Sequence, residues 1–172
     1  MELKPGDRVD RYLLVELLGE GGQGSVWRAE DPMLPGQPRA VKLLRLETVR
    51  PTDAERVRLE ARGLAKLEHP SLVSCHTLFE DMKLGVLGMV LDFVDGRSLG
   101  AALNDSRLTD RHRVKALGHV AEALAYVHRA GHVHRDLKLD NVLVTQDFWA
   151  NPEEPKNVKL VDFGIADRKS VV

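Results

Sequence analysis

The stretch HVHRDLKLDNVLV occupies residues 132–144. It places an acid, a cation and a carboxamide in one short loop, at Asp136, Lys138 and Asn141. These groups could serve as a proton acceptor, a phosphate ligand and a metal ligand. A polar loop of this kind is also common on solvated surfaces, so its meaning depends on the motifs around it.

The composition indicates an ordinary globular chain and excludes several classes of partner. The 172 residues are 43% hydrophobic and 30% charged, with a formal net charge of −1, so no overall field favours nucleic acid or an acidic membrane. Cys75 is the single cysteine, which rules out an internal disulfide. With no signal-like N-terminus and no apolar run of about 18 residues, the sequence predicts a cytoplasmic protein without a membrane segment.

Hydrophobic periodicity and turn residues predict an α+β chain in two lobes. The first helix is expected to use Thr52 or Asp53 as its N-cap and to close at His69-Pro70. The second is expected from Thr109 to Ala130, with its apolar residues Leu117, Val120, Ala121, Leu124 and Val127 buried. The expected strands are 11–19, 25–30, 39–46, 72–79 and 85–94, followed by short strands near the C-terminal end.

Three glycines between the first two predicted strands form the pattern G-x-G-x-x-G, at Gly19, Gly21 and Gly24. Without Cβ atoms, their backbone N–H groups can approach phosphate oxygens closely. A flexible hairpin turn explains the pattern equally well. Dinucleotide binding is disfavoured, because a strand-like run follows the glycines where that motif requires a helix.

A lysine and a glutamate both fall on predicted inward faces. Strand alternation puts Lys42 on one face with Ala40 and Leu44, and Glu60 falls within the apolar stripe of the first helix. Because an unpaired buried ion is costly, the two side chains are predicted to face each other. The alternative is that both extend to solvent.

The stretch VDFG, residues 161–164, supplies a further carboxylate at Asp162. Mg²⁺ prefers one or two carboxylates together with phosphate and water. Asn141 and Asp162 would meet that preference if their loops face each other.

Together these motifs resemble a Hanks-type Ser/Thr protein kinase domain, the eukaryotic-like class. The set comprises G-x-G-x-x-G-x-V, A-x-K, a helix glutamate before His-Pro, H-R-D-L-K-x-x-N and D-F-G, all in family order. The resemblance implies a protein-kinase-like α+β fold. Residues 1–94 would form a complete β-rich N-lobe with one main helix and the hinge, and residues 95–172 the first part of a mainly helical C-lobe.

The resemblance implies ATP as cofactor and assigns most of its contacts to the first lobe. Lys42 would hold the α- and β-phosphates, and Glu60 would hold Lys42. The glycine loop would cover the phosphates, the backbones of Asp92 and Val94 would bind adenine, and three side chains would sandwich the ring. The implied cofactor-binding residues are Gly19, Gly21, Gly24, Val26, Ala40, Lys42, Glu60, Asp92, Val94 and Leu143.

The resemblance also implies the catalytic roles. Asp136 would accept the proton of a Ser or Thr hydroxyl on a protein substrate, and Lys138 would neutralise the γ-phosphate. Asn141 and Asp162 would bind Mg²⁺. The identity of the protein substrate is not implied.

Two departures from the family pattern lead to further expectations. The insertion DFWANPEEPKN, residues 147–157, is longer than usual, and its Phe148 and Trp149 either contact a partner or pack locally. The activation segment and A-P-E motif do not follow D-F-G, which predicts a truncated domain whose exposed second helix is covered by a partner or a missing C-terminal region. An ATP-binding but catalytically incompetent fragment or pseudokinase-like module is the alternative to an active kinase.

Overall fold

The computed structural model describes residues 2–21, 24–46 and 51–165, with only the backbone at 51–53. The chain forms two compact units, which are described separately. The first comprises Met1–Lys66, Cys75–Phe93 and Ile165–Val172, and the second comprises Leu67–Ser74 and Val94–Gly164.

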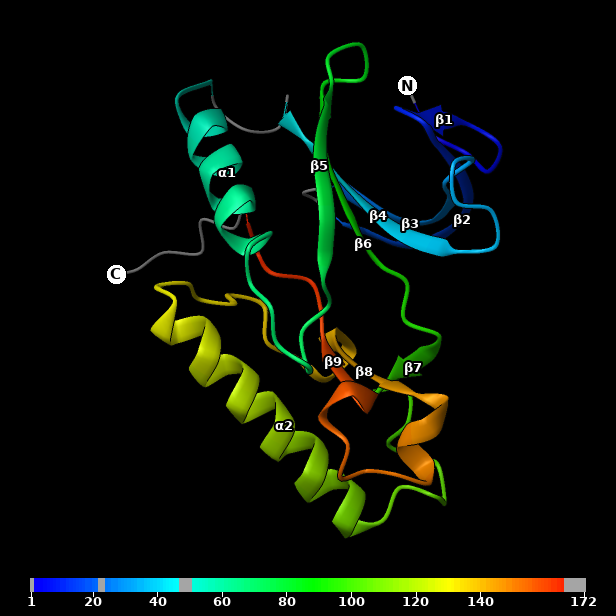
Figure 1. Ribbon diagram of the computed structural model, residues 1–172, viewed down its shortest axis with the longest axis vertical. Helices are drawn as coiled ribbons and strands as arrows, with labels where there is room; N and C mark the ends of the chain where they lie inside the picture. Colours follow the sequence, from blue (N-terminus) through cyan, green and yellow to red (C-terminus); the bar gives the residue numbers. More distant parts are fainter. Residues whose placement is uncertain (1, 22–23, 47–50, 166–172) are drawn as a thin grey trace. The chain divides into compact units, whose positions relative to one another are not determined.

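The first unit is built on a six-stranded antiparallel sheet with the order β1-β2-β3-β4-β6-β5 (Figure 1). Its strands are β1 Arg8–Val9, β2 Tyr12–Gly21, β3 Gly24–Glu30, β4 Pro38–Arg45, β5 Cys75–Asp81 and β6 Val86–Asp92. The predicted hairpin around the glycines is therefore confirmed. The strand predicted at 72–79 begins at Cys75, because the residues before it belong to the second unit.

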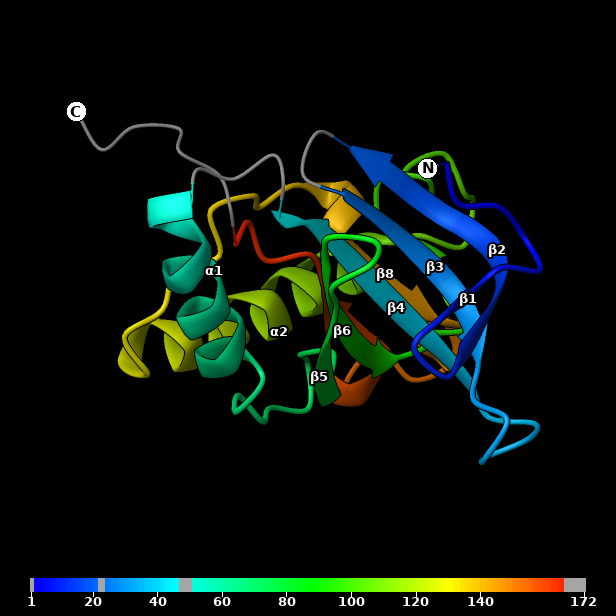
Figure 2. The same ribbon diagram turned by 90° about the horizontal axis from the view of Figure 1, so that it is seen from above.

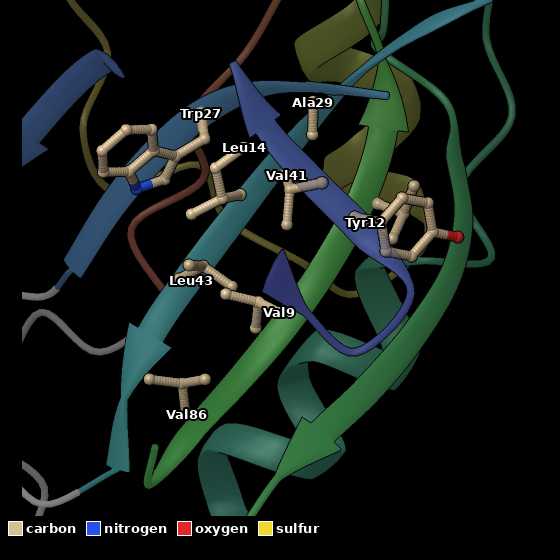
Figure 3. Close-up of a cluster of buried hydrophobic side chains, with 9 residues drawn as sticks. Val9, Tyr12, Leu14, Trp27, Ala29, Val41, Leu43 and Val86 are labelled. Carbon is tan, nitrogen blue, oxygen red and sulfur yellow. The ribbon is translucent and has the colours of Figure 1, made fainter. Parts of the chain in front are cut away.

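Strand alternation divides this sheet into two faces with different roles. On one face, Val26, Lys42 and Met89 lie side by side across β3, β4 and β6. The opposite face carries a hydrophobic core, shown in Figure 3. The core residues are Val9, Tyr12, Leu14, Trp27, Ala29, Val41, Leu43, Val86 and Val90.

Helix α1, Pro51–Leu64, lies beside β5 and β6 and away from β1 and β2 (Figure 2). Its predicted apolar stripe is confirmed, because Val57, Ala61 and Leu64 are buried. Arg58 donates two hydrogen bonds to the Glu80 carboxylate of β5, at 2.8 and 3.0 Å. The predicted N-cap at Thr52 or Asp53 is wrong, because both residues lie inside the first helical turn.

The second unit combines one long helix with a small antiparallel sheet, β7-β8-β9 (Figure 1). Helix α2 spans Asp110–Arg129, with Thr109 as N-cap and Ala130 as C-cap, as predicted. Thr109 and His112 form a capping box, and Gly131 follows in the left-handed region at φ 80°. The strands are β7 Gly96–Ser98, β8 Val142–Thr145 and β9 Val158–Leu160, and the 3₁₀ turns are η2 Leu139–Asn141, η3 Gln146–Trp149 and η4 Pro155–Asn157.

The insertion after β8 packs locally on the start of α2. Phe148 is fully buried and meets the His112 ring edge-on, with centroids 5.3 Å apart. The guanidinium groups of Arg97 and Arg107 both lie over the Trp149 ring, 4.9 and 4.4 Å from its centroid. Both arginines also bind Asp105, and the hydrogen bonds from Arg107 and Arg97 hold the pKa of that carboxyl well below its usual range.

One face of α2 remains exposed. Val120 and Val127 are buried as expected, but Leu117 is 57% exposed and Val114 on the same helix is 67% exposed. Ala121 is exposed as well, so the expected burial of Leu117 and Ala121 is wrong in the chain as described. No helix in the described ranges has the length and apolar character that a membrane crossing requires.

The core face of the first sheet predicts a specific steric dependence between Gly88 and Phe79. A Cβ atom added at Gly88 would lie 2.2 Å from Cζ of the Phe79 ring, which covers this glycine from β5. We therefore expect Gly88→Ala to lower the free energy of unfolding by about 1–3 kcal/mol, measured by urea denaturation.

In a Phe79→Ala background the same substitution is expected to cost almost nothing, because the clashing ring is gone. Gly118→Ala on α2 is the matched control: its added Cβ meets no atom within 4 Å. Replacing glycine there should stabilise the helix by up to about 1 kcal/mol. An equal cost for Gly88→Ala in both backgrounds would contradict the steric explanation.

Candidate nucleotide-binding and catalytic site

The loop within residues 132–144 is organised around the carboxylate of Asp136. The Asn141 amide donates to the Asp136 backbone carbonyl at 2.8 Å and to its Oδ2 atom at 2.9 Å. Lys138 Nζ donates to the same Oδ2 at 2.9 Å. Three of the residues predicted to be functional are therefore brought together within one hydrogen-bonded group.

These hydrogen bonds have a clear electrostatic consequence. The bond from Lys138 and the bond from Asn141 lower the pKa of the Asp136 carboxyl, since each stabilises its ionised form. Asp136 in turn raises the pKa of the Lys138 ammonium. The carboxylate is thus ionised at neutral pH and presents an acceptor to a hydroxyl group.

His134 joins this loop to the segment that contains Asp162. Its ring is buried, and Nδ1 accepts a hydrogen bond from the Asp136 backbone N–H at 3.3 Å. Nδ1 is therefore unprotonated, and Nε2–H donates to the Val161 carbonyl at 2.8 Å. The Gly164 N–H donates to the His134 carbonyl at 2.9 Å, so the two segments are joined through side chain and backbone.

Both segments contain a non-glycine residue in the left-handed region, Arg135 and Asp162, each at φ 65°. Such backbone is sparsely populated and persists when surrounding contacts fix it. The His134 bonds on either side supply that fixation. The Phe163 ring also packs on the His134 ring, with centroids 4.6 Å apart.

The glycine motif of the first unit lies where β2 and β3 meet, and its three glycines differ in their surroundings. Gly24 has φ 151°, and an added Cβ would lie 1.8 Å from the Leu43 carbonyl oxygen, so the sheet itself requires glycine there. At Gly19 and Gly21 an added Cβ meets no described atom within 4 Å. No described atom therefore requires glycine at these two positions on steric grounds.

Val26, Ala40 and Lys42 share one face of the sheet, because Val26 pairs with Lys42 and Ala40 is two residues away on β4. Helix α1 lies on this same face. Its Arg58 side chain binds Glu80 of β5, and Glu80 pairs with Leu87, a β6 residue on the face that carries Lys42. Lys42 and Glu60 are thus on facing elements of one unit. Their direct pairing stays a prediction.

The remaining predicted adenine ligands are divided between the units. Asp92 is the last residue of β6 and pairs with Arg39 of β4 in the first unit. Val94 and Leu143 belong to the second unit, where Leu143 pairs with Ser98 of β7.

Three side chains that no sequence pattern singled out fix Leu67–Ser74 to the rest of the second unit. The Glu68 N–H donates to the Tyr126 hydroxyl at 3.1 Å. Ser71 Oγ donates to the Pro155 carbonyl at 2.7 Å, and Lys159 Nζ donates to the Pro70 carbonyl at 2.7 Å. The sequence signal was weak, because a tyrosine on a helix and a lysine in a strand are common on surfaces.

Comparison with known proteins agrees with this arrangement. A sequence model of the protein kinase domain matches residues 12–170. The chain is 39% identical over 161 residues to the serine/threonine-protein kinase PknA of Mycobacterium tuberculosis, an alignment that covers 91% of this chain and 35% of PknA. A probable serine/threonine-protein kinase of Streptomyces coelicolor is 38% identical over 161 residues, covering 91% of this chain and 22% of that protein.

Among solved structures, the PknI kinase domain of Mycobacterium tuberculosis matches with a TM-score of 0.74 and 29% identity. That match covers 98% of this chain and 66% of the PknI chain. The chain belongs to the protein kinase domain family and has the protein-kinase-like fold, which confirms the resemblance to Ser/Thr kinases of the Hanks type. It spans between 22% and 35% of the length of the two curated relatives above.

The hydrogen bonds of Asn141 predict a local stability effect. Asn141 is only 4% exposed, and its replacement by alanine leaves the Asp136 carbonyl without its 2.8 Å donor. We expect Asn141→Ala to lower the free energy of unfolding by about 1–3 kcal/mol in urea denaturation. Asp140→Asn, an exposed neighbour in the same 3₁₀ turn, is the control and should stay within about 0.5 kcal/mol of wild type. Equal stability of Asn141→Ala and wild type would show that these bonds contribute nothing.

Proposed function

We propose that this chain carries the residues of an ATP- and Mg²⁺-dependent Ser/Thr protein kinase that bind nucleotide and transfer its γ-phosphoryl group. The observation that carries the proposal is the Asp136 carboxylate, held by Lys138 and Asn141 within H-R-D-L-K-x-x-N. Its lowered pKa keeps it ionised, as an acceptor for the proton of a substrate hydroxyl must be.

Mg²⁺ fits the oxygen donors of the second unit. Because the Asn141 NH₂ group is directed at Asp136, the opposite end of the carboxamide, Oδ1, is the end that would contact a cation. Asp162 adds a carboxylate from the segment that His134 joins to the same loop. One carboxylate and one amide oxygen, together with phosphate oxygens, suit this hard ion. When bound, Mg·ATP supplies the phosphoryl group and neutralises part of its charge.

The first unit would hold the nucleotide. Gly19 and Gly21 have space beside their Cα atoms, and together with Gly24 they would cover the phosphates. Lys42 would bind the α- and β-phosphates and Glu60 would orient it, while Val26 and Ala40 would contact the base from the same sheet face. The backbones of Asp92 and Val94, with the side chain of Leu143, would complete the adenine contacts.

The organisation of the domain remains part of this proposal. Residues 1–94 would act as N-lobe and hinge and residues 95–172 as the beginning of the C-lobe, in a cytoplasmic protein. The phosphate acceptor would be a Ser or Thr of a protein substrate. The exposed face of α2 that contains Val114 and Leu117 would be covered by further kinase sequence or by a partner.

The test is transfer of radiolabelled γ-phosphate from ATP to a generic basic protein by the natural polypeptide that carries this sequence. We expect Mg²⁺-dependent transfer that Asp136→Asn reduces by about 10²–10⁴-fold, the usual contribution of a general base. Thermal stabilisation by Mg·ATP should persist in this variant, because Asp136 does not hold the nucleotide.

Asp140→Asn is the matched control: it removes a neighbouring exposed carboxylate outside the proposed roles and should leave transfer unchanged. Wild-type protein that is stabilised by Mg·ATP but transfers nothing would favour the alternative of an incompetent nucleotide-binding module. Wild-type protein that neither binds nor transfers would overturn the proposal.

A further inference from the structure

The end of strand β6 is held by backbone pairing on one side and by a side-chain contact on the other. On one side, its last residue Asp92 still pairs with Arg39 of β4. On the other side, the ladder with β5 ends one residue earlier, at the pair Cys75 and Leu91. The register shifts between Cys75 and Thr77, so His76 is an extra residue in a β-bulge.

This bulge directs the His76 side chain toward Asp92, the β6 residue just beyond the last β5–β6 pair. His76 Nε2 lies 2.6 Å from Asp92 Oδ1, although both side chains are more than one-third exposed. The bulge itself is closed by Cys75 Sγ, which contacts the Thr77 carbonyl oxygen at 3.6 Å. A side-chain bond thus replaces the missing backbone bonds at the last position of β6.

The next residue, Phe93, is held by a side chain of β3, which lies two places from β6 in the sheet order. The Arg28 guanidinium of β3 lies over the Phe93 ring, 5.3 Å from its centroid. Arg28 pairs with Ala40, so it belongs to the sheet face that carries Val26 and Lys42. The same guanidinium lies 3.9 Å from the Glu16 carboxylate of β2, through Nη1, and its buried Nε atom has no hydrogen-bond partner among the described residues.

We infer that His76 and Arg28 are positioning residues for the nucleotide base: they fix the backbone of Asp92 and Phe93 before ATP binds. The inference rests on the proposed function, in which the Asp92 backbone binds adenine. A backbone group that is already ordered loses less entropy when it binds a ligand, so preorganisation appears as affinity. Neither side chain is among the residues proposed to hold the phosphates or the substrate hydroxyl, so we expect the rate of the bound complex not to depend on them.

The experiment measures the dissociation constant for Mg·ATP by displacement of a fluorescent nucleotide, and kcat by phosphate transfer, in the natural polypeptide. We expect His76→Ala to raise the dissociation constant by about 2–5-fold, the size of an exposed polar side-chain contact, with kcat unchanged. Arg28→Met, which keeps the aliphatic length without the charge, should raise it by about 2–5-fold through loss of the cation–π contact. The double variant should show about the product of the two effects, because the contacts lie on different strands.

Two controls separate positioning from general damage. His76→Gln retains an N–H donor for Asp92 and should recover most of the wild-type affinity. His128→Ala, an exposed histidine at the end of α2, should change neither constant. Binding of Mg·tripolyphosphate, which has no base, should be the same in wild type and in His76→Ala.

Each result bears on a different statement. Three results would overturn the inference while the proposed function stands. They are unchanged ATP affinity in His76→Ala, an equal loss of affinity for Mg·tripolyphosphate in that variant, and a fall in kcat at unchanged ATP affinity. Wild-type protein that does not bind Mg·ATP would overturn the proposed function and this inference with it.

Discussion

The second unit depends on one buried carboxamide. Asn141 is almost inaccessible to water, and both hydrogens of its amide nitrogen are directed at Asp136, one at the backbone carbonyl and one at the carboxylate. Because both acceptors belong to one residue, the side chain fixes the direction of the loop and of its carboxylate together. The backbone carbonyl of Asn141 accepts the Val161 N–H at 2.9 Å, so the same residue also holds the segment that leads to Asp162. An apolar residue at position 141 could provide neither of the two side-chain bonds to Asp136.

The first unit follows a different constraint, the alternation of side chains along β3 and β4. One face of the sheet carries a hydrophobic core around Leu14, Trp27 and Val41. The other face is thereby left for Val26 and Lys42 and for helix α1. A one-residue slip in register would exchange the two faces, so the packing of the core also determines where Lys42 points. The position of the residues proposed to bind nucleotide is in this sense a consequence of the core on the opposite face of the sheet.

Much of this arrangement could be predicted from sequence because its signals are local. Thr109 and Gly131 bracket α2 by capping chemistry, and the glycines of the β2–β3 hairpin mark its turn. Other features depend on residues distant in sequence. That Leu67–Ser74 joins the second unit is decided by Tyr126 and Lys159, and the bulge that aims His76 at Asp92 has no sequence signature. The N-cap of α1 was misplaced because Thr52 and Asp53 suit a cap and a first helical turn alike.

The hydrogen bonds around Asp136 are tested most directly by the titration of its carboxyl group, followed by ¹³C NMR in the folded chain. We expect a pKa below the ordinary aspartate value, because Lys138 and then Asn141 stabilise the ionised form, and a higher pKa in Lys138→Met. Since the folded pKa is depressed, this carboxylate stabilises the fold above its unfolded pKa, and that contribution disappears as pH falls through the folded pKa. A wild-type Asp136 pKa at or above the ordinary value, unchanged by Lys138→Met, would contradict the arrangement on which the proposed chemistry rests.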